Sequence, residues 1–243
     1  MNSKNLLFPF LSLGALFMLP ACSDSDDHQF DTLRPTALVT VCPNADGTFV
    51  MQLDNTTKLI PTNVSTSPFG EKEVRALVNY TETSDISANE HSRNVHVNWL
   101  DSIRTKMPVL TAGEENDKLY GKDPIEIVND WVTIAEDGYI TMRIRTLWGT
   151  PGAVHYINLV SGTNPENPFE FELRHNAQGD TYGEWGDALI AFNLNSLTNG
   201  ESQPVDIKLN WQSFAGPQSA EFKLQMRQPG ILYVENKDLH LLE

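Results

Sequence analysis

Hydrophobic and polar residues alternate along many short stretches of the chain, which is the period of strands that bury one face. Residues 37–41 and 48–53 are predicted to pair as a hairpin, because residues 44–47 between them carry the turn-forming sequence Asn, Ala, Asp, Gly. Residues 74–80 and 94–99 alternate in the same way and are predicted to be half-buried strands.

Short strands with no convincing helical period between them favour a small closed barrel, since an open sheet would leave exposed edges. We therefore expect an oligonucleotide/oligosaccharide-binding (OB)-type barrel over residues 36–110, followed by a linker in the polar run 111–117. Later strand-like segments have the spacing of a β-sandwich, which we expect over residues 118–243. These segments are 125–134, 139–147, 154–160, 169–174, 188–194, 205–211 and 220–226, with 231–234 as a candidate edge strand. The predicted fold class is all-β, a barrel followed by a sandwich.

The first residues have the pattern of a secretory signal peptide. Lys4 supplies a positive charge, and residues 6–19 form an apolar run that is too short for a permanent membrane span. Leu19 and Ala21 precede Cys22 in the spacing of a lipobox, which predicts cleavage after residue 21 and lipidation of Cys22. The expected partner of the acylated cysteine is the lipid of the outer membrane, where acyl chains would anchor the protein stably.

An acidic run follows Cys22 and is composed of Ser23, Asp24, Ser25, Asp26 and Asp27. It resembles the export signal that directs lipoproteins of Bacteroides-type bacteria to the outer face of the outer membrane. The alternative is an ordinary solvated tether, and we expect residues 22–35 to be flexible in either case. The predicted location is therefore the outer membrane, lipid-anchored and facing the cell exterior.

The charge balance narrows the range of partners. The formal net charge is −15, which argues against a nucleic-acid partner, because such partners are bound through excess Lys and Arg. Only two cysteines occur, and if Cys22 carries lipid then Cys42 has no partner for an intrachain disulfide. Cys42 lies in an apolar strand pattern and is expected to be inert and buried.

Several segments in this order and spacing resemble the NigD-like lipoproteins of Bacteroides-type bacteria. They are the lipobox, Leu53-Asp54 through Leu59 and Pro61, Arg75-Ala76-Leu77-Val78-Asn79-Tyr80, Asp123-Pro124-Ile125-Glu126, His155-Tyr156-Ile157-Asn158-Leu159-Val160, and Leu173-Arg174-His175-Asn176-Ala177 followed by Gly179-Asp180. The resemblance implies an N-terminal OB-type barrel and a C-terminal β-sandwich. It implies an immunity or accessory role linked to bacteriocins, and it brings no catalytic residues.

Two clusters are candidate ligand-binding sites. His175, Asn176 and Asp180 follow one predicted strand and could bind a metal or a sugar, although the same residue types also form tight connections between strands. A second cluster consists of Tyr182, Glu184, Trp185 and Asp187. Its aromatic rings could stack on sugar rings and its carboxylates could bind hydroxyl groups, or Trp185 could simply cover the end of the sandwich.

Catalytic and cofactor motifs are missing from the sequence. There is no metal-binding spacing of histidines or cysteines, no nucleophile motif, and no phosphate-binding loop, so we expect no metal, cofactor or catalytic residue. Residues 149–152 carry two glycines but lack the lysine, and are predicted to form a hairpin turn. His96 and His155 lie in strand patterns where one hydrogen bond each would account for them.

These observations favour a non-enzymatic surface lipoprotein that binds an unidentified extracellular protein or glycan, with a bacteriocin-immunity or accessory role. The alternative is a carbohydrate-binding accessory protein of a surface glycan-uptake system, for which Tyr182 and Trp185 are the motivation.

Overall fold

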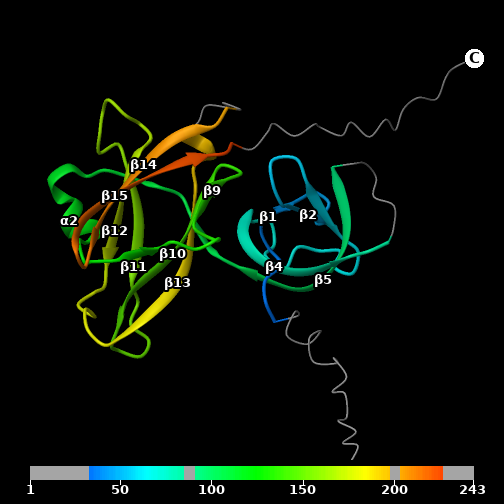
Figure 1. The fold of residues 1–243 in the computed structure, drawn as a ribbon, viewed down its shortest axis with the longest axis horizontal. Helices are drawn as coiled ribbons and strands as arrows, with labels where there is room; N and C mark the ends of the chain where they lie inside the picture. The colour runs from blue at the N-terminus through cyan, green and yellow to red at the C-terminus, as the bar shows by residue number, and fades with distance from the viewer. Residues whose placement is uncertain (1–32, 85–90, 198–202, 227–243) are drawn as a thin grey trace, which may run out of the picture. The chain divides into compact units, whose positions relative to one another are not determined.

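The computed structural model describes residues 33–84, 91–197 and 203–226 (Figure 1). The predicted signal peptide 1–21, Cys22, the acidic run 23–27 and the candidate edge strand 231–234 lie outside these residues. From Arg34 on, the described residues belong to one compact unit that consists mainly of strands. Among them, no helix has both the length and the apolar character needed to cross a membrane.

The first half forms the predicted closed barrel, with its strands in the order β1-β2-β3-β5-β4. The predicted hairpin is confirmed, since Thr40 pairs with Gln52 and Pro43 with Phe49 in antiparallel register. Gly47 allows the turn because it adopts a φ of +86°. The strands are β1 (Ala37–Pro43), β2 (Phe49–Gln52), β3 (Lys58–Pro61), β4 (Val74–Glu82) and β5 (Ser92–Ser102).

The interior of the barrel is filled by apolar side chains, and each strand contributes at least one that is fully buried. Val39, Met51, Leu59, Val78 and Val95 come from β1, β2, β3, β4 and β5 in turn. Each such burial contributes roughly 1.5–3 kcal/mol relative to exposure. The described strands of the barrel therefore enclose a packed apolar core.

The second half is the predicted sandwich of two sheets. One sheet has the order β6-β13-β10-β8, with β9 paired to β10, and the other has the order β15-β14-β12-β11-β7. The first is built from β6 (Arg104–Lys106), β8 (Glu126–Val128), β9 (Ile134–Glu136), β10 (Tyr139–Trp148) and β13 (Glu184–Asn193). The second is built from β7 (Val109–Leu110), β11 (Tyr156–Ser161), β12 (Glu170–Asn176), β14 (Val205–Ser213) and β15 (Gly216–Leu224).

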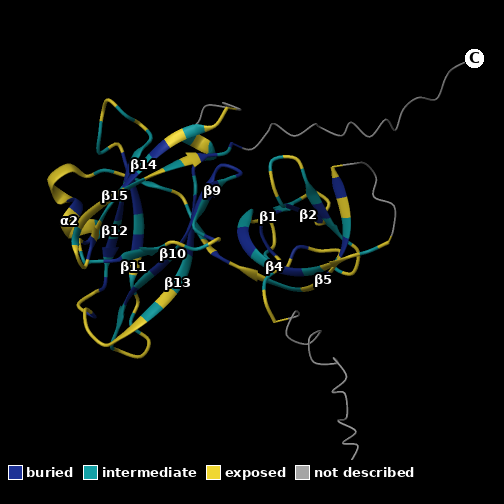
Figure 2. Ribbon diagram, in the orientation of Figure 1, coloured by how far each residue is buried: buried dark blue, intermediate teal, exposed yellow. Residues whose placement is uncertain are grey.

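The core of the sandwich lies between the two sheets, where the buried residues of β10 and β12 are seen in Figure 2. Met142 and Phe192 from the first sheet pack with Phe171 and Leu209 from the second, and all four are almost completely buried. Alternate residues on the same strands therefore face away from this core.

The boundary between the halves differs from the predicted one. β6 pairs in parallel with β13, and β7 pairs in parallel with β11, so residues 104–110 belong to the sandwich sheets and not to the barrel. The predicted linker 111–117 holds the 3₁₀ helix η1 (Gly113–Glu115) and the start of α2 (Asn116–Tyr120). Its polar side chains satisfy the backbone there, since Asn116 accepts a hydrogen bond from the Ala112 N–H.

Strand β4 also corrects the expectation of a half-buried strand. Arg75 and Asn79 alternate with the barrel core and were expected to face water, but both are buried. Arg75 is covered by β9 and β10 of the sandwich, where it bonds Glu136 and Thr141. A small apolar cluster around Leu38, Ile103 and Ala191 packs in the same region.

Candidate functional site

His175 and Asp180, two of the predicted ligand-binding residues, are joined through a third residue, His155. His155 Nδ1 lies 2.9 Å from His175 Nε2, and His155 Nε2 lies 3.2 Å from Asp180 Oδ2. At the other end, His175 Nδ1 lies 3.0 Å from the carbonyl oxygen of Pro124. Strands β11 and β12 are antiparallel, and Ile157 lies opposite His175. His155 precedes Ile157 by two residues, so its ring comes to lie beside that of His175.

The number of protons in this chain of hydrogen bonds determines its charge. Each of the three bonds needs one proton, whereas two neutral imidazoles supply only two. With the third proton the cluster of His155, His175 and Asp180 is neutral overall. Burial lowers the pKa of His175, against a smaller opposing effect of its bond to Pro124.

Asp180 accepts further hydrogen bonds that keep it ionised. Burial raises the pKa of its carboxyl group, but the backbone N–H of Gly149 and the ring of His155 lower it further, and the net pKa is below its usual value. Gly149 N lies 3.1 Å from Asp180 Oδ2. A β-carbon at position 149 would lie 2.6 Å from the ring of Tyr182, so this close approach requires glycine.

Residues 149–152 do not form the predicted hairpin turn. They connect β10 in one sheet to β11 in the other, so the segment crosses the end of the sandwich. Trp148, the last residue of β10, stacks on the ring of His155 with 3.9 Å between ring centroids and 27° between planes. Stacking of two aromatic rings is a favourable arrangement.

This cluster is closed to solvent and its polar atoms are already bonded to one another. The side chains of His155 and Asp180 are only 1% and 4% exposed. In the part of the chain that the structure describes, no three histidine, cysteine or carboxylate side chains are placed to hold a metal ion. The cluster therefore stabilises the connections at this end of the sandwich, and only His175 borders an open space.

The remaining predicted residues do not form one site. Asn176 accepts a hydrogen bond from the backbone of Gln178 and so shapes its own turn. Tyr182 is exposed, and its hydroxyl lies 3.2 Å from that of Thr150. Glu184 is exposed at the start of β13.

Asp187 and Trp185 lie farther along β13 and have different partners. Asp187 pairs with Arg145 and Arg143 across the sheet, and these bonds lower its pKa to about 2. Trp185 is 54% exposed and meets Phe214 edge to face, with 4.8 Å between ring centroids. Asp187 is thus fully engaged, whereas the Trp185–Phe214 pair remains accessible.

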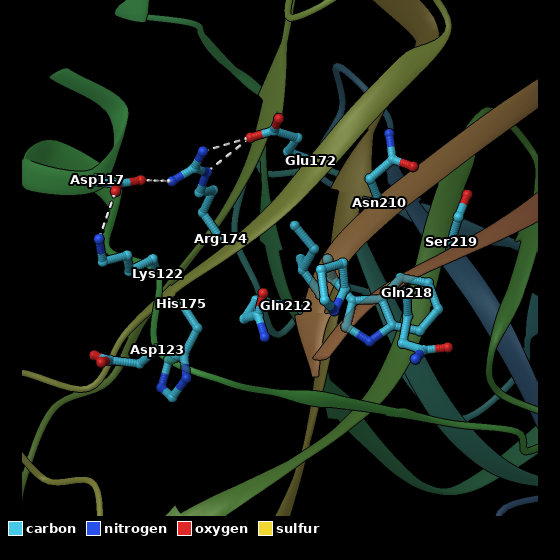
Figure 3. Close-up of a pocket in the computed structure, with 13 residues that line it drawn as sticks. Asp117, Lys122, Asp123, Glu172, Arg174, His175, Asn210, Gln212, Gln218 and Ser219 are labelled. Carbon is cyan, nitrogen blue, oxygen red and sulfur yellow. Dashed lines mark hydrogen bonds and ion pairs between the residues drawn. The ribbon is translucent and has the colours of Figure 1, made fainter. Parts of the chain in front are cut away.

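The open space that His175 borders is a hollow of about 580 Å³ on the second sheet (Figure 3). Its residues come from β12, β14 and β15 and from the segment at the end of α2. They are Asp117, Lys122, Asp123, Glu172, Leu173, Arg174, His175, Asn210, Trp211, Gln212, Pro217, Gln218 and Ser219. Glu172 pairs with Asn210, and Asn210 pairs with Ser219, so these three form one row across the sheet on the side away from the core.

Four charged residues of the hollow are paired with one another, as the dashed lines of Figure 3 show, and the fifth, Asp123, accepts a hydrogen bond from the backbone N–H of Ala177. Arg174 bonds both Glu172 and Asp117, and Lys122 lies 2.9 Å from Asp117. The bonds from Lys122 and Arg174 lower the pKa of Asp117. Two cations and two carboxylates therefore cancel along this side of the hollow.

The uncharged polar groups of the hollow have spare hydrogen-bonding capacity. Gln218 and Ser219 are exposed, and their side chains have no hydrogen-bond partner among the described residues. Asn210 and Gln212 each use their amide nitrogen, on Glu170 and on the backbone of Ser213, which leaves their oxygens as acceptors. The indole N–H of Trp211 is buried and also lacks a partner within the described part of the chain.

Sequence patterns did not indicate most of this site. His155 was predicted to need one hydrogen bond, but it makes two and links the cluster. The residues of the hollow are separated along the chain and meet only through strand pairing. The one available indication was that the polar residues Asn210 and Gln212 alternate with the apolar residues Leu209 and Trp211 along one strand.

A closed five-stranded barrel followed by a two-sheet sandwich, with a polar hollow on the outer side of the sandwich, defines a two-domain all-β protein. Residues 38–103 match the NigD-like N-terminal OB domain, and residues 108–224 match the NigD-like C-terminal beta sandwich domain. The chain therefore belongs to the NigD-like family. No match was found among curated proteins.

Solved structures of similar proteins have the same fold. A protein of Parabacteroides distasonis described as toxin-related is 33% identical, with a TM-score of 0.65 over 78% of this chain and 92% of its own. A NigD-like immunity protein from Bacteroides caccae is 22% identical, with a TM-score of 0.54 over 77% of this chain and 91% of its own. A protein of Bacteroides fragilis described as a lipoprotein is 12% identical, with a TM-score of 0.53 over 79% of this chain and 98% of its own.

Proposed function

We propose that this protein is a non-enzymatic surface lipoprotein that acts by binding an extracellular molecule, and that its leading role is bacteriocin immunity or an accessory function to it. Acylated Cys22 would anchor the chain in the outer membrane, and residues 23–27 would direct it to the exterior. The description of the Bacteroides fragilis relative as a lipoprotein supports the anchor.

The observation that carries the binding role is the contrast between the two polar regions of the sandwich. In the buried cluster His155, His175 and Asp180 use their polar atoms on one another. In the hollow, Ser219 has a free hydroxyl that faces solvent, and Asn210 and Gln212 have free acceptor oxygens. Unused polar groups on a rigid sheet suit ligand recognition, because little ordering is needed on binding.

The immunity role is supported by the family. The Bacteroides caccae relative is described as an immunity protein, and the Parabacteroides distasonis relative as toxin-related. An immunity protein at the cell surface would capture a secreted toxin before it reached its target. The lipid anchor would raise the local concentration of the protein where the toxin arrives.

A killing assay tests this role. A strain that lacks the gene is challenged with concentrated culture supernatants of competing strains that secrete bacteriocins. We expect the strain to become sensitive to at least one supernatant and to be protected by the wild-type gene but not by Cys22→Ser. Equal survival of the deletion strain and its parent in every supernatant would refute immunity.

The second candidate is a carbohydrate-binding accessory protein of a glycan-uptake system. The specific observation in its favour is the accessible aromatic pair Trp185 and Phe214, since sugar rings stack on exposed aromatic faces. Growth of the deletion strain on purified polysaccharides is its test. A growth defect on one polysaccharide supports this role, and normal growth on all of them contradicts it.

A further inference from the structure

The hollow on the second sheet has a chemical character that narrows its ligand. Its volume of about 580 Å³ lies within the range of about 300–1,000 Å³ that is usual for small-molecule sites. The row Glu172, Asn210 and Ser219 forms part of its floor, beside Gln212 and Pro217, which pair across β14 and β15.

Hydroxyl-rich ligands match the free groups of this floor. The hydroxyl of Ser219 can donate and accept, and the amide oxygens of Asn210 and Gln212 can accept, whereas Gln218 pairs with Trp211 and its side chain lies on the other face of the sheet. A sugar hydroxyl also donates and accepts, so one sugar ring can satisfy several of these groups together. Pro217 adds an apolar surface for the C–H face of such a ring.

Charged ligands fit less well. Arg174 and Lys122 already form ion pairs with Glu172 and Asp117, so they offer no unpaired positive charge to an anion. The whole chain carries a net charge of −15, which also disfavours a polyanion. A metal ion is disfavoured because the carboxylates Glu172 and Asp117 are held by these cations and Asp123 accepts a hydrogen bond from the backbone N–H of Ala177.

An extended peptide fits less well for a geometric reason. The backbone N–H and C=O of Gln225 bond Ala135 and Gly138, so they point away from β14. Backbone groups of alternate residues along a strand point the same way, so the C=O of Pro217 also points to this outer edge. Proline has no N–H to offer an added strand at that outer edge. Glu221 and Lys223, which share this edge, place charges where a further strand would pair.

A second hollow continues the first toward the aromatic pair. It has a volume of about 490 Å³, shares Lys122, Asp123 and Gln212 with the first, and is also lined by Phe214. Phe214 in turn contacts Trp185. A ligand of several linked rings could therefore lie in the first hollow and reach the exposed aromatic surface beyond it.

From these observations we infer that the hollow between β12, β14 and β15 binds a neutral oligosaccharide, which extends past Gln212 toward Phe214 and Trp185. This inference rests on the proposed function only in taking the protein to act by binding. It names the ligand of the hollow and does not depend on an immunity role.

The test uses the mature chain with Cys22→Ser, which keeps every residue described here. It is screened on an array of neutral oligosaccharides, and hits are measured by titration calorimetry. We expect binding that weakens at least about tenfold in the double variant Gln212→Ala with Ser219→Ala, since two or more hydrogen bonds are lost. The matched control is Asp206→Ala with Lys223→Ala, an exposed pair on the same two strands outside the hollow, which should bind as the parent does.

Three other outcomes overturn the inference, and a fourth separates it from the proposed immunity role. No binding to any neutral oligosaccharide at millimolar concentration excludes this ligand class, and undiminished binding in the double variant excludes this hollow. If the double variant instead loses protection in the killing assay without any glycan binding, the hollow binds a protein and the proposed immunity role stands. Glycan binding in a protein that gives no protection would refute immunity and leave the inference intact.

Discussion

Arg75 of barrel strand β4 and Glu136 of sandwich strand β9 form an ion pair with 2.5 Å between Nη2 and Oε1. The guanidinium is completely buried and also donates to the hydroxyls of Thr40 and Thr141, at 2.9 and 3.3 Å. Its donors therefore reach both domains at once. Nearby, the Tyr139 hydroxyl of β10 donates to Glu73, which precedes β4. The junction between the domains is thus held by specific polar contacts.

Replacing Arg75 with methionine should destabilise the protein strongly. The change leaves Glu136, Thr40 and Thr141 without their common partner in a closed junction. Breaking a buried ion pair costs about 3–5 kcal/mol, and we expect about 3 kcal/mol because Glu136 is 21% exposed and can bind water. The measurement is the free energy of unfolding in urea.

The control for this prediction is Arg93→Ala, which removes an arginine from an exposed pair with Glu82 on the same barrel. It should leave the free energy of unfolding almost unchanged, because solvent screens exposed pairs. Similar losses in the free energy of unfolding for the two variants would show that burial does not strengthen the contribution of Arg75.

Acid should destabilise the protein through His175. Burial lowers the pKa of this ring in the folded protein, whereas in the unfolded chain it has its ordinary value of 6.5. Below pH 6.5 the unfolded chain therefore takes up a proton that the folded protein does not, and stability falls as the pH falls toward the folded pKa. The slope from this one group is at most about 1.4 kcal/mol per pH unit.

Urea unfolding at several pH values between about 7.5 and 5.5 measures this slope, because these limits lie about one pH unit on either side of the ordinary pKa. His175→Gln keeps a donor for Pro124 and an acceptor for His155 but cannot titrate, so its slope should be shallower. His96→Gln, at an exposed position of β5, should keep the parent slope. An unchanged slope in His175→Gln would mean that other groups cause the acid sensitivity.

Trp185→Ala should weaken glycan binding while it changes the free energy of unfolding only a little. The side chain is 54% exposed and its only ring contact recorded among the described residues is with Phe214, so the free energy of unfolding should fall by less than about 1.5 kcal/mol. If a glycan reaches this pair, its affinity should fall about fivefold or more, as expected for the loss of one stacking contact of about 1 kcal/mol. Tyr182→Ala, a similarly exposed aromatic that neither hollow includes, is the matched control.

The fold was predictable from the alternation of hydrophobic and polar residues, because most strands bury one face. The hairpin of β1 and β2 and the order of barrel and sandwich follow from residue patterns and turns. Arg75 shows where this argument fails. Its position predicts exposure on the outside of the barrel, but the outside of β4 is covered by another domain, which a single-strand pattern cannot indicate.

The candidate site was predictable only in part for a similar reason. His175 and Asp180 were identified as local candidates, but their connection depends on His155, which the register of β11 against β12 brings beside them. The row of Glu172, Asn210 and Ser219 likewise exists only once three strands are paired. Sequence patterns specify which face of a strand a residue occupies, and pairing decides which residues of other strands lie next to it.

The anchor at Cys22 is the central claim of the proposed function, and its most direct test is the location of the protein in cells. Cells that express the wild-type chain or Cys22→Ser are separated into membrane and soluble fractions, and intact cells are treated with protease. We predict that the wild-type protein is in the outer membrane and is cleaved on intact cells, whereas Cys22→Ser is released into the soluble fraction. Equal membrane association of the two proteins would contradict the account.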